Sequence, residues 1–166
     1  VRQYVQSQKP AALPLAGVLK NLSQLLDSQR GSWAGFKAIA EEPAIEGCLT
    51  SSSIHWYYPK LQEERLEFVK SNSWRRSTLG FQEPVNGEIY PVESLDGFLV
   101  PGLAFSKKGQ RVGRGKGFYD KTLARAKGLK VGVCYSYQLF TELPVQDHDI
   151  PMDIVVSDQG IIWLKR

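Results

Sequence analysis

Residues 97–105 read Gly-Phe-Leu-Val-Pro-Gly-Leu-Ala-Phe, and this stretch indicates the fold class. The run is apolar and bounded by glycine and proline, which is typical of a strand buried on both faces of a mostly parallel sheet. Residues 118–127 then follow a helical pattern, in which Leu123 and Ala126 can face a core and Gly128 can cap the helix. A strand followed by a loop and a helix predicts an α/β fold.

Other segments continue this alternation. Residues 13–28 predict a helix, because their leucines and valine recur at helical spacing. Further short strands are expected near residues 33–39, 54–58, 66–70, 98–100, 130–135, 154–156 and 161–164. Within one of these strands, Trp56 and Tyr58 should share a face and Tyr57 should lie on the other, because side chains alternate along a strand.

The loop between the strand and the helix, residues 109–120, reads Gly-Gln-Arg-Val-Gly-Arg-Gly-Lys-Gly-Phe-Tyr-Asp. Its glycines permit positive φ angles and close approach of a ligand to the backbone, so that successive N–H groups can face an anion. Three basic residues stand among these glycines: Arg111, Arg114 and Lys116. Guanidinium and ammonium groups suit phosphate oxygens. The loop therefore predicts a site for a phosphorylated ligand, beside which Asp120 can hold magnesium.

A basic surface turn explains the same residues equally well when the loop is taken alone. Two better-known phosphate motifs are excluded. The G-x-x-x-x-G-K-[ST] pattern fails because Gly117 follows Lys116, and G-x-G-x-x-G fails because Phe118 occupies the last glycine position. The flanking strand and helix favour the ligand site, because a helix N-terminus attracts anions.

Length and composition agree with one domain over residues 1–166, of which 42% are hydrophobic. We expect a cytoplasmic protein, because the sequence has neither an apolar run of about 18 residues nor a secretory signal at its start. Cys48 and Cys134 are isolated, which favours two reduced cysteines over a zinc site or a disulfide. The net charge of +4 is compatible with anionic ligands.

Three ordered segments, residues 100–105, 109–120 and 143–149, together resemble the 5-formyltetrahydrofolate cyclo-ligase family, the methenyltetrahydrofolate synthetases. The last segment reads Leu-Pro-Val-Gln-Asp-His-Asp, and weaker similarity extends to residues 33–42, 54–59 and 81–84. The resemblance implies a three-layer, Rossmann-like and mostly parallel sheet, as in sugar-phosphate isomerases and CoA transferases. It places the glycine loop at the carboxyl edge of a strand, where such sheets bind ligands.

The resemblance also implies an activity. ATP would phosphorylate the formyl oxygen of 5-formyltetrahydrofolate, N10 would attack, and release of phosphate would give 5,10-methenyltetrahydrofolate, with ADP as the other product. Such chemistry asks the protein mainly for positioning and for neutralisation of phosphate charge by Arg, Lys and Mg²⁺. The implied ligands are ATP, Mg²⁺ and a folate that can carry a polyglutamate tail; the protein is expected to be a monomer that binds neither nucleic acid nor membranes.

Site residues follow from the same resemblance, position by position. Arg114 and Lys116 are the implied catalytic residues, and Asp120 and Asp149 the implied metal ligands. The implied ATP-binding residues are Arg2, Arg111, Val112, Gly113, Arg114, Gly115, Lys116, Gly117, Phe118 and Tyr119. The implied substrate-binding residues are Glu42, Arg114, Gly115, Lys116, Gly117 and Phe118.

Ordinary structural roles compete with several of these assignments. Asp120 can simply favour the first turn of a helix, and Asp149 can belong to a polar turn. Glu42 competes with Glu41, and either can be a helix N-terminal carboxylate beside Pro43. His148 is interpreted as a loop residue that makes a local hydrogen bond.

Two questions stay open at this level. The family has a basic N-terminal helix whose lysine and arginine, four residues apart, reach ATP. Arg2 matches the arginine, whereas the lysine would fall before residue 1. Either the given sequence starts within this helix, or the ATP site has one basic residue fewer than in the family. The main alternative function is that of a non-catalytic folate-binding or nucleic-acid-binding relative, since a pI near 9.1 and clustered cations also suit nucleic acids.

Overall fold

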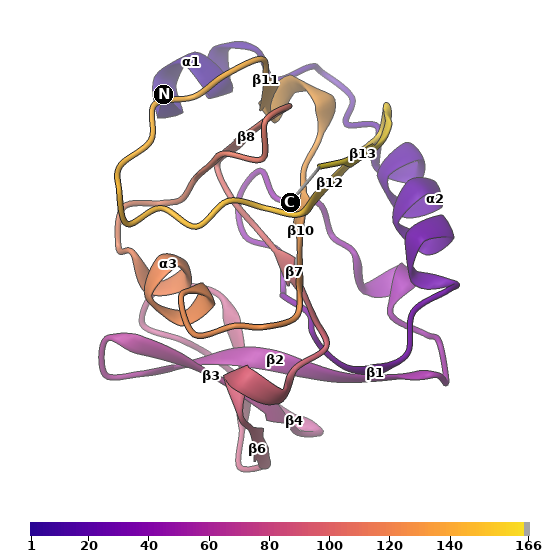
Figure 1. Ribbon diagram of the computed structural model, residues 1–166, viewed down its shortest axis with the longest axis vertical. Helices are drawn as coiled ribbons and strands as arrows, with labels where there is room; N and C mark the ends of the chain where they lie inside the picture. Colours follow the sequence, from indigo (N-terminus) through magenta and orange to yellow (C-terminus); the bar gives the residue numbers. More distant parts are fainter. Residues whose placement is uncertain (165–166) are drawn as a thin grey trace.

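An eight-stranded sheet organises the computed structural model, which describes residues 1–164 (Figure 1). Across the sheet the strands are β13 (Gly160–Trp163), β12 (Ile154–Ser157), β10 (Leu129–Val133), β7 (Gly97–Val100), β1 (Gly31–Ala34), β2 (Ile54–Gln62), β3 (Arg65–Lys70) and β6 (Glu88–Tyr90). The five strands from β12 to β2 pair in parallel, and β13, β3 and β6 are antiparallel to their neighbours. The predicted mostly parallel α/β sheet is confirmed.

Strand β7 lies in the middle of this sheet, and all four of its residues are buried, as predicted. Gly97 is required by close packing, because a side chain there would collide with the indole of Trp33 on β1. The apolar run does not continue as one strand, however, since the chain leaves the sheet at Pro101. Proline lacks the N–H that a central strand must donate, which ends the strand at this point.

After the chain leaves the main sheet at Pro101, it forms strands of a second, three-stranded sheet. This second sheet consists of β11 (Leu139–Phe140), β8 (Ala104–Ser106) and β9 (Arg111–Val112). The prediction that the glycine loop connects the buried strand directly to a helix is therefore corrected. The antiparallel pair β8–β9 intervenes. Strand β9 lies within residues 109–120, and residues 113–117 then lead into the next helix. A two-residue strand is too short to produce a sequence pattern.

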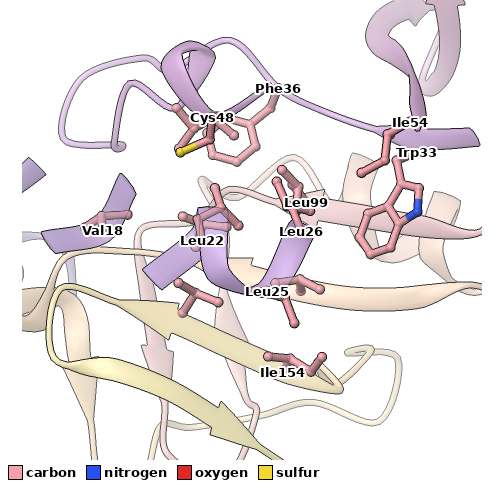
Figure 2. Close-up of a cluster of buried hydrophobic side chains, with 14 of the residues drawn as sticks. Val18, Leu22, Leu25, Leu26, Trp33, Phe36, Cys48, Ile54, Leu99 and Ile154 are labelled. Atoms are coloured by element: carbon pink, nitrogen blue, oxygen red, sulfur yellow. The ribbon is translucent and has the colours of Figure 1, made fainter. Parts of the chain in front are cut away.

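Helices cover both faces of the main sheet. Helix α2 (Leu15–Leu26) packs on one face, where its Val18, Leu22, Leu25 and Leu26 join Trp33, Phe36 and Leu99 in a buried cluster (Figure 2). Helix α3 (Phe118–Leu123) lies on the other face with Leu123 in a second cluster (Figure 1). The three layers that the resemblance implied are thus present.

Both predicted helices are shorter in the structure than in the sequence pattern. Helix α2 begins after Pro14 rather than at residue 13, and ends at Leu26 rather than at residue 28. Helix α3 ends at Leu123, because Arg125 and Ala126 donate to carbonyls only three residues back, which tightens and closes the last turn. Gly128 is not its cap. A side chain at Gly128 would instead collide with the backbone of residues 95 and 96.

Most predicted strands are confirmed with shifts of one to a few residues. The exception is the strand expected over residues 33–39, because β1 ends at Ala34 and the chain then turns toward the edge of the sheet. The alternation in β2 is confirmed, since Trp56 packs in the cluster under α2 whereas Tyr57 packs in the opposite cluster against Tyr90.

The remaining elements are short and had not been predicted, apart from the N-terminal helix that the resemblance implied. They are α1 (Arg2–Ser7), the 3-10 helices η1 (Glu46–Cys48), η2 (Val92–Ser94) and η3 (Ser136–Gln138), and the antiparallel pair β4 (Ser73–Arg76) and β5 (Gln82–Val85). Cys48 and Cys134 are both free and buried, as expected. Within residues 1–164, no helix has the length and apolarity needed to cross a membrane.

Helix α2 provides a test of this packing. Leu22 is fully buried between α2 and the sheet, so Leu22→Ala is expected to lower the free energy of unfolding by about 2–5 kcal/mol. Urea denaturation measures this loss, and the exposed Lys20→Ala on the same helix should stay within about 0.5 kcal/mol of the wild type. Equal losses in the two variants would contradict the assigned core.

Candidate active site

A cavity of about 740 Å³ opens at the carboxyl edge of the main sheet. Its walls come from the segment after β1, from Pro101 and Gly102 after β7, from residues 111–120, and from residues 144–146, 148 and 149. Adjacent parallel strands end at the same edge of a sheet, which brings these distant segments together. The predicted position of the glycine loop at this edge is confirmed.

Three of the four glycines in residues 109–120, namely Gly113, Gly115 and Gly117, serve two different purposes. Gly115 and Gly117 have φ angles of +97° and +69°, which L side chains rarely adopt, and the space around them is open. Gly113 has no positive φ, but a Cβ there would lie 3.1 Å from the guanidinium nitrogens of Arg111. Gly113 therefore makes room for Arg111, whereas Gly115 and Gly117 shape the turn that enters α3.

Arg111 fastens the loop to the end of β7. Its Nε donates a hydrogen bond of 2.7 Å to the carbonyl oxygen of Pro101, and its guanidinium lies 5.0 Å from the ring centroid of Tyr119. Burial lowers the pKa of Arg111, against the opposing influence of Tyr119 and Asp120, although a guanidinium remains charged at any ordinary pH. Burial also raises the pKa of Tyr119, so its hydroxyl stays protonated as a hydrogen-bond donor.

Arg114 lies between two carboxylates. Its Nε donates to Oε1 of Glu42 at 3.3 Å, and its Nη2 lies 3.6 Å from Oε2 of Glu41. Burial raises the pKa of Glu42, while the Ile39 N–H, which donates to Oε2 at 3.0 Å, and the Arg114 charge oppose this shift. Both glutamates thus hold Arg114, and Glu42 is the one that lines the cavity.

The capping interpretation of these glutamates is wrong. No helix begins at Pro43 in the described chain, and the next helical element, η1, starts only at Glu46. Glu42 instead closes a local turn through the Ile39 N–H and faces Arg114. Glu41 also accepts a weak hydrogen bond of 3.4 Å from Nε2 of Gln6, which links α1 to this side of the cavity.

Asp120 and Asp149 approach each other across the cavity wall, together with His148. One potential ligand atom from each of the three residues lies within 4.8 Å of the others. Asp120 accepts a hydrogen bond from the Ile150 N–H at 3.3 Å, and Asp149 accepts one from the Gln146 N–H at 2.7 Å. Asp120 lies in the first turn of α3 and Asp149 belongs to a turn, so the local roles predicted as alternatives are present. The two carboxylates also lie near each other, which neither role requires.

His148 was missed as a member of this cluster. Its Nε2 lies 3.6 Å from Oδ1 of Asp149, and its side chain is largely exposed. Its position next to Asp149 in the sequence was the available signal. Several apolar lining residues were also missed, because such residues form no motif: Phe36, Pro59, Leu66, Leu79 and Phe81.

The other sequence-predicted residues are placed as follows. Val112, Lys116 and Phe118 line the cavity along with the glycines, and Lys116 is exposed to it. Arg2 is exposed on α1 and does not contribute to the lining, whereas Val1 does. Helix α1 packs beside the cavity through Val5, which is buried against Ala104 and Leu143. Arg2 is thus the one predicted site residue that the structure leaves outside the cavity.

Comparison with known proteins identifies relatives of this chain. Its residues 48–158 match the family model described as "5-formyltetrahydrofolate cyclo-ligase family". The 5-formyltetrahydrofolate cyclo-ligase of Escherichia coli K12 is 41% identical over 77 residues, 45% of this chain and 42% of that protein. The mouse protein of the same name is 32% identical over 103 residues, 58% of this chain and 50% of that protein. The chain thus spans about half the length of these curated relatives.

Solved structures match over more of the chain. The solution structure of Aquifex aeolicus 5,10-methenyltetrahydrofolate synthetase is similar with a TM-score of 0.78 and 31% identity, over 92% of this chain and 82% of that one. A synthetase of the same name from Mycoplasma pneumoniae shares the fold with a TM-score of 0.76 at 21% identity. The loop, the buried glutamate and the paired aspartates lie within this shared fold, and the chain belongs to the 5-formyltetrahydrofolate cyclo-ligase family.

Proposed function

We propose that the chain catalyses the ATP-dependent cyclisation of 5-formyltetrahydrofolate to 5,10-methenyltetrahydrofolate, with release of ADP and phosphate. One observation supports this most: a single cavity is lined by a basic glycine loop, the buried Glu42 and the adjacent carboxylates of Asp120 and Asp149. Phosphoryl transfer needs cations that bind the phosphates, acidic groups that bind a divalent cation, and a polar group that positions the substrate accepting the phosphoryl group.

The basic loop is proposed to bind ATP. Arg114 and Lys116 are proposed to contact the transferring phosphoryl group, and the N–H groups around Gly115 and Gly117 to face the phosphate oxygens. Arg111 is fixed by the Pro101 carbonyl, so it supplies a positive charge at a constant position. Charge that is in place before the reaction stabilises the transition state without reorganisation.

Glu42 is proposed to bind the folate. Its burial makes a hydrogen bond to a ligand strong, and its contact with Arg114 joins the substrate side of the cavity to the phosphate side. Neighbouring apolar residues such as Phe36 and Phe81 provide a surface on which flat rings can lie. The formyl oxygen would then lie near Arg114, where the phosphoryl group arrives.

Mg²⁺ is proposed to be held by Asp120 and Asp149. Carboxylate oxygens are the ligands that Mg²⁺ prefers, and one potential ligand atom of each side chain lies within 4.8 Å of the other, so these two residues would hold the ion. The imidazole of His148 is a less suitable ligand for this ion, so His148 is proposed to keep its contact with Asp149. The bound ion would neutralise charge on the triphosphate.

The proposed reaction balances without a nucleophile from the protein. The formyl oxygen attacks the γ-phosphorus and ADP leaves, which converts a poor leaving group into a phosphate. The lone pair of N10 then forms a bond to the formyl carbon, the C–O bond breaks, and inorganic phosphate departs while the N10 proton is lost. The protein's part is to orient the formyl oxygen, to hold the phosphates and to compensate their charge.

A direct assay tests the function. The purified protein is mixed with 5-formyltetrahydrofolate, ATP and Mg²⁺, and the near-ultraviolet absorbance of 5,10-methenyltetrahydrofolate is followed. We expect the absorbance to rise only when ATP is present. The absence of any ATP-dependent signal would exclude the proposed enzyme and favour a non-catalytic relative.

Lys116→Ala is expected to lower kcat about 100-fold or more, because it removes a positive charge from the transferring phosphoryl group. The matched control is Lys121→Ala, which removes an exposed lysine on α3 outside the cavity lining and should leave kcat unchanged. Both values come from the same absorbance assay. A normal kcat for Lys116→Ala would remove this residue from the mechanism.

Asp120→Asn is expected to raise the Mg²⁺ concentration required for half-maximal activity by about tenfold or more, because one anionic oxygen ligand is lost. Asp147→Asn is the control, since Asp147 is exposed in the same region and does not line the cavity. The dependence of rate on Mg²⁺ is measured at saturating ATP. Identical Mg²⁺ curves for the two variants would rule out Asp120 as a ligand.

A further inference from the structure

Lys37 is a cation of the cavity wall that the proposed chemistry does not use. It follows β1 and lines the same cavity as the apolar residues Phe36, Pro59, Leu66, Leu79 and Phe81. Within residues 1–164, its ammonium group forms no salt bridge and no side-chain hydrogen bond. The wall therefore presents a lysine without a counter-ion.

Two aromatic rings hold this lysine in place. Its Nζ lies 4.6 Å from the ring centroid of Trp74 and 5.1 Å from that of Tyr58. The two rings are themselves packed edge to face, with centroids 5.0 Å apart. Ring faces attract an ammonium group and limit its rotamers, but they do not neutralise its charge. Lys37 is consequently both pre-positioned and available to an anion.

The other cations of the cavity contact protein groups or belong to the glycine loop. Arg111 is bound to the Pro101 carbonyl, and Arg114 lies between two glutamates. Lys116 belongs to the glycine loop. Of these four cations, Lys37 is the one that lies outside the glycine loop in the sequence, and apolar side chains also line the cavity. A ligand that contacts both the apolar lining residues and Lys37 needs an apolar part and a separate anionic group.

We propose that Lys37 binds a carboxylate of the substrate's glutamate and so determines specificity for a folate over a pteridine that lacks this group. This inference rests on the proposed function, because a folate joins flat rings to a glutamate tail. The rings would contact the apolar wall, and the carboxylate would reach Lys37. Longer glutamate tails add carboxylates of the same chemistry, to which the same residue can respond.

The test couples a change in the protein to a change in the ligand. Isothermal titration calorimetry measures the affinity of the wild type and of Lys37→Gln for 5-formyltetrahydrofolate and for the amide of 5-formyltetrahydropteroate, which lacks the glutamate and carries no carboxylate. Removal of the glutamate is expected to weaken wild-type binding about two- to fivefold, as for a partly exposed charged pair. For Lys37→Gln, most of this difference should disappear.

Two further variants separate binding from structural effects. Lys37→Arg keeps the charge and should retain the glutamate-dependent difference. Lys107→Gln removes an exposed lysine outside the cavity and should behave as the wild type. Thermal unfolding of each variant checks that Lys37→Gln has folded, and a loss of stability alone would not alter the ratio of the two affinities.

The outcomes are distinct. An equal glutamate-dependent loss in the wild type and in Lys37→Gln overturns the inference and leaves the proposed function intact. A fall in ATP affinity with unchanged folate discrimination also overturns it and assigns Lys37 to the nucleotide. If the wild type binds neither pteridine, the proposed function fails and the inference fails with it.

Discussion

The hydrogen bond from Arg111 to the carbonyl oxygen of Pro101 connects the site to the fold. Pro101 ends the buried strand β7, so its carbonyl has no partner strand to bond and is available at the sheet edge. The glycine at position 113 leaves room for the guanidinium, because a Cβ there would lie 3.1 Å from its nitrogens. The loop is therefore attached to a fully buried central strand, and its remaining groups are placed relative to that strand.

Burial also explains why Arg114 has two acidic neighbours. An arginine enclosed without compensation would carry a large desolvation penalty, and Glu41 and Glu42 reduce this penalty in the absence of a ligand. Arg114 is thereby held at the cavity wall before any phosphate arrives. The same pair couples different parts of the chain, because Glu41 contacts α1 through Gln6 and Glu42 contacts the turn after β1.

The predictability of each feature from the sequence follows from its physical origin. The buried strands and α2 were predicted, because burial on a sheet imposes a continuous or periodic apolar pattern. The loop was predicted as a phosphate site from its glycines and cations, and the resemblance added Glu42 and Asp149. The pair β8–β9 and the early ends of β1 and α3 were not predictable, since they depend on Pro101, on three-residue turns and on contacts between distant segments. Lys37 was also not predicted, because its position depends on a contact between distant segments. The ring of Trp74, which its ammonium group contacts, lies 37 residues away in the sequence.

The charges of the cavity give a reason for a divalent cation. Its lining contains four cations, Lys37, Arg111, Arg114 and Lys116, and three carboxylates, from Glu42, Asp120 and Asp149. The protein's own charge is thus nearly balanced, whereas a nucleoside triphosphate carries several negative charges. Without further positive charge, the triphosphate would lie close to Asp120 and Asp149 and be repelled by them. The proposed magnesium ion would reverse the sign of that interaction, so the two aspartates would favour binding of the metal-bound nucleotide over the free one.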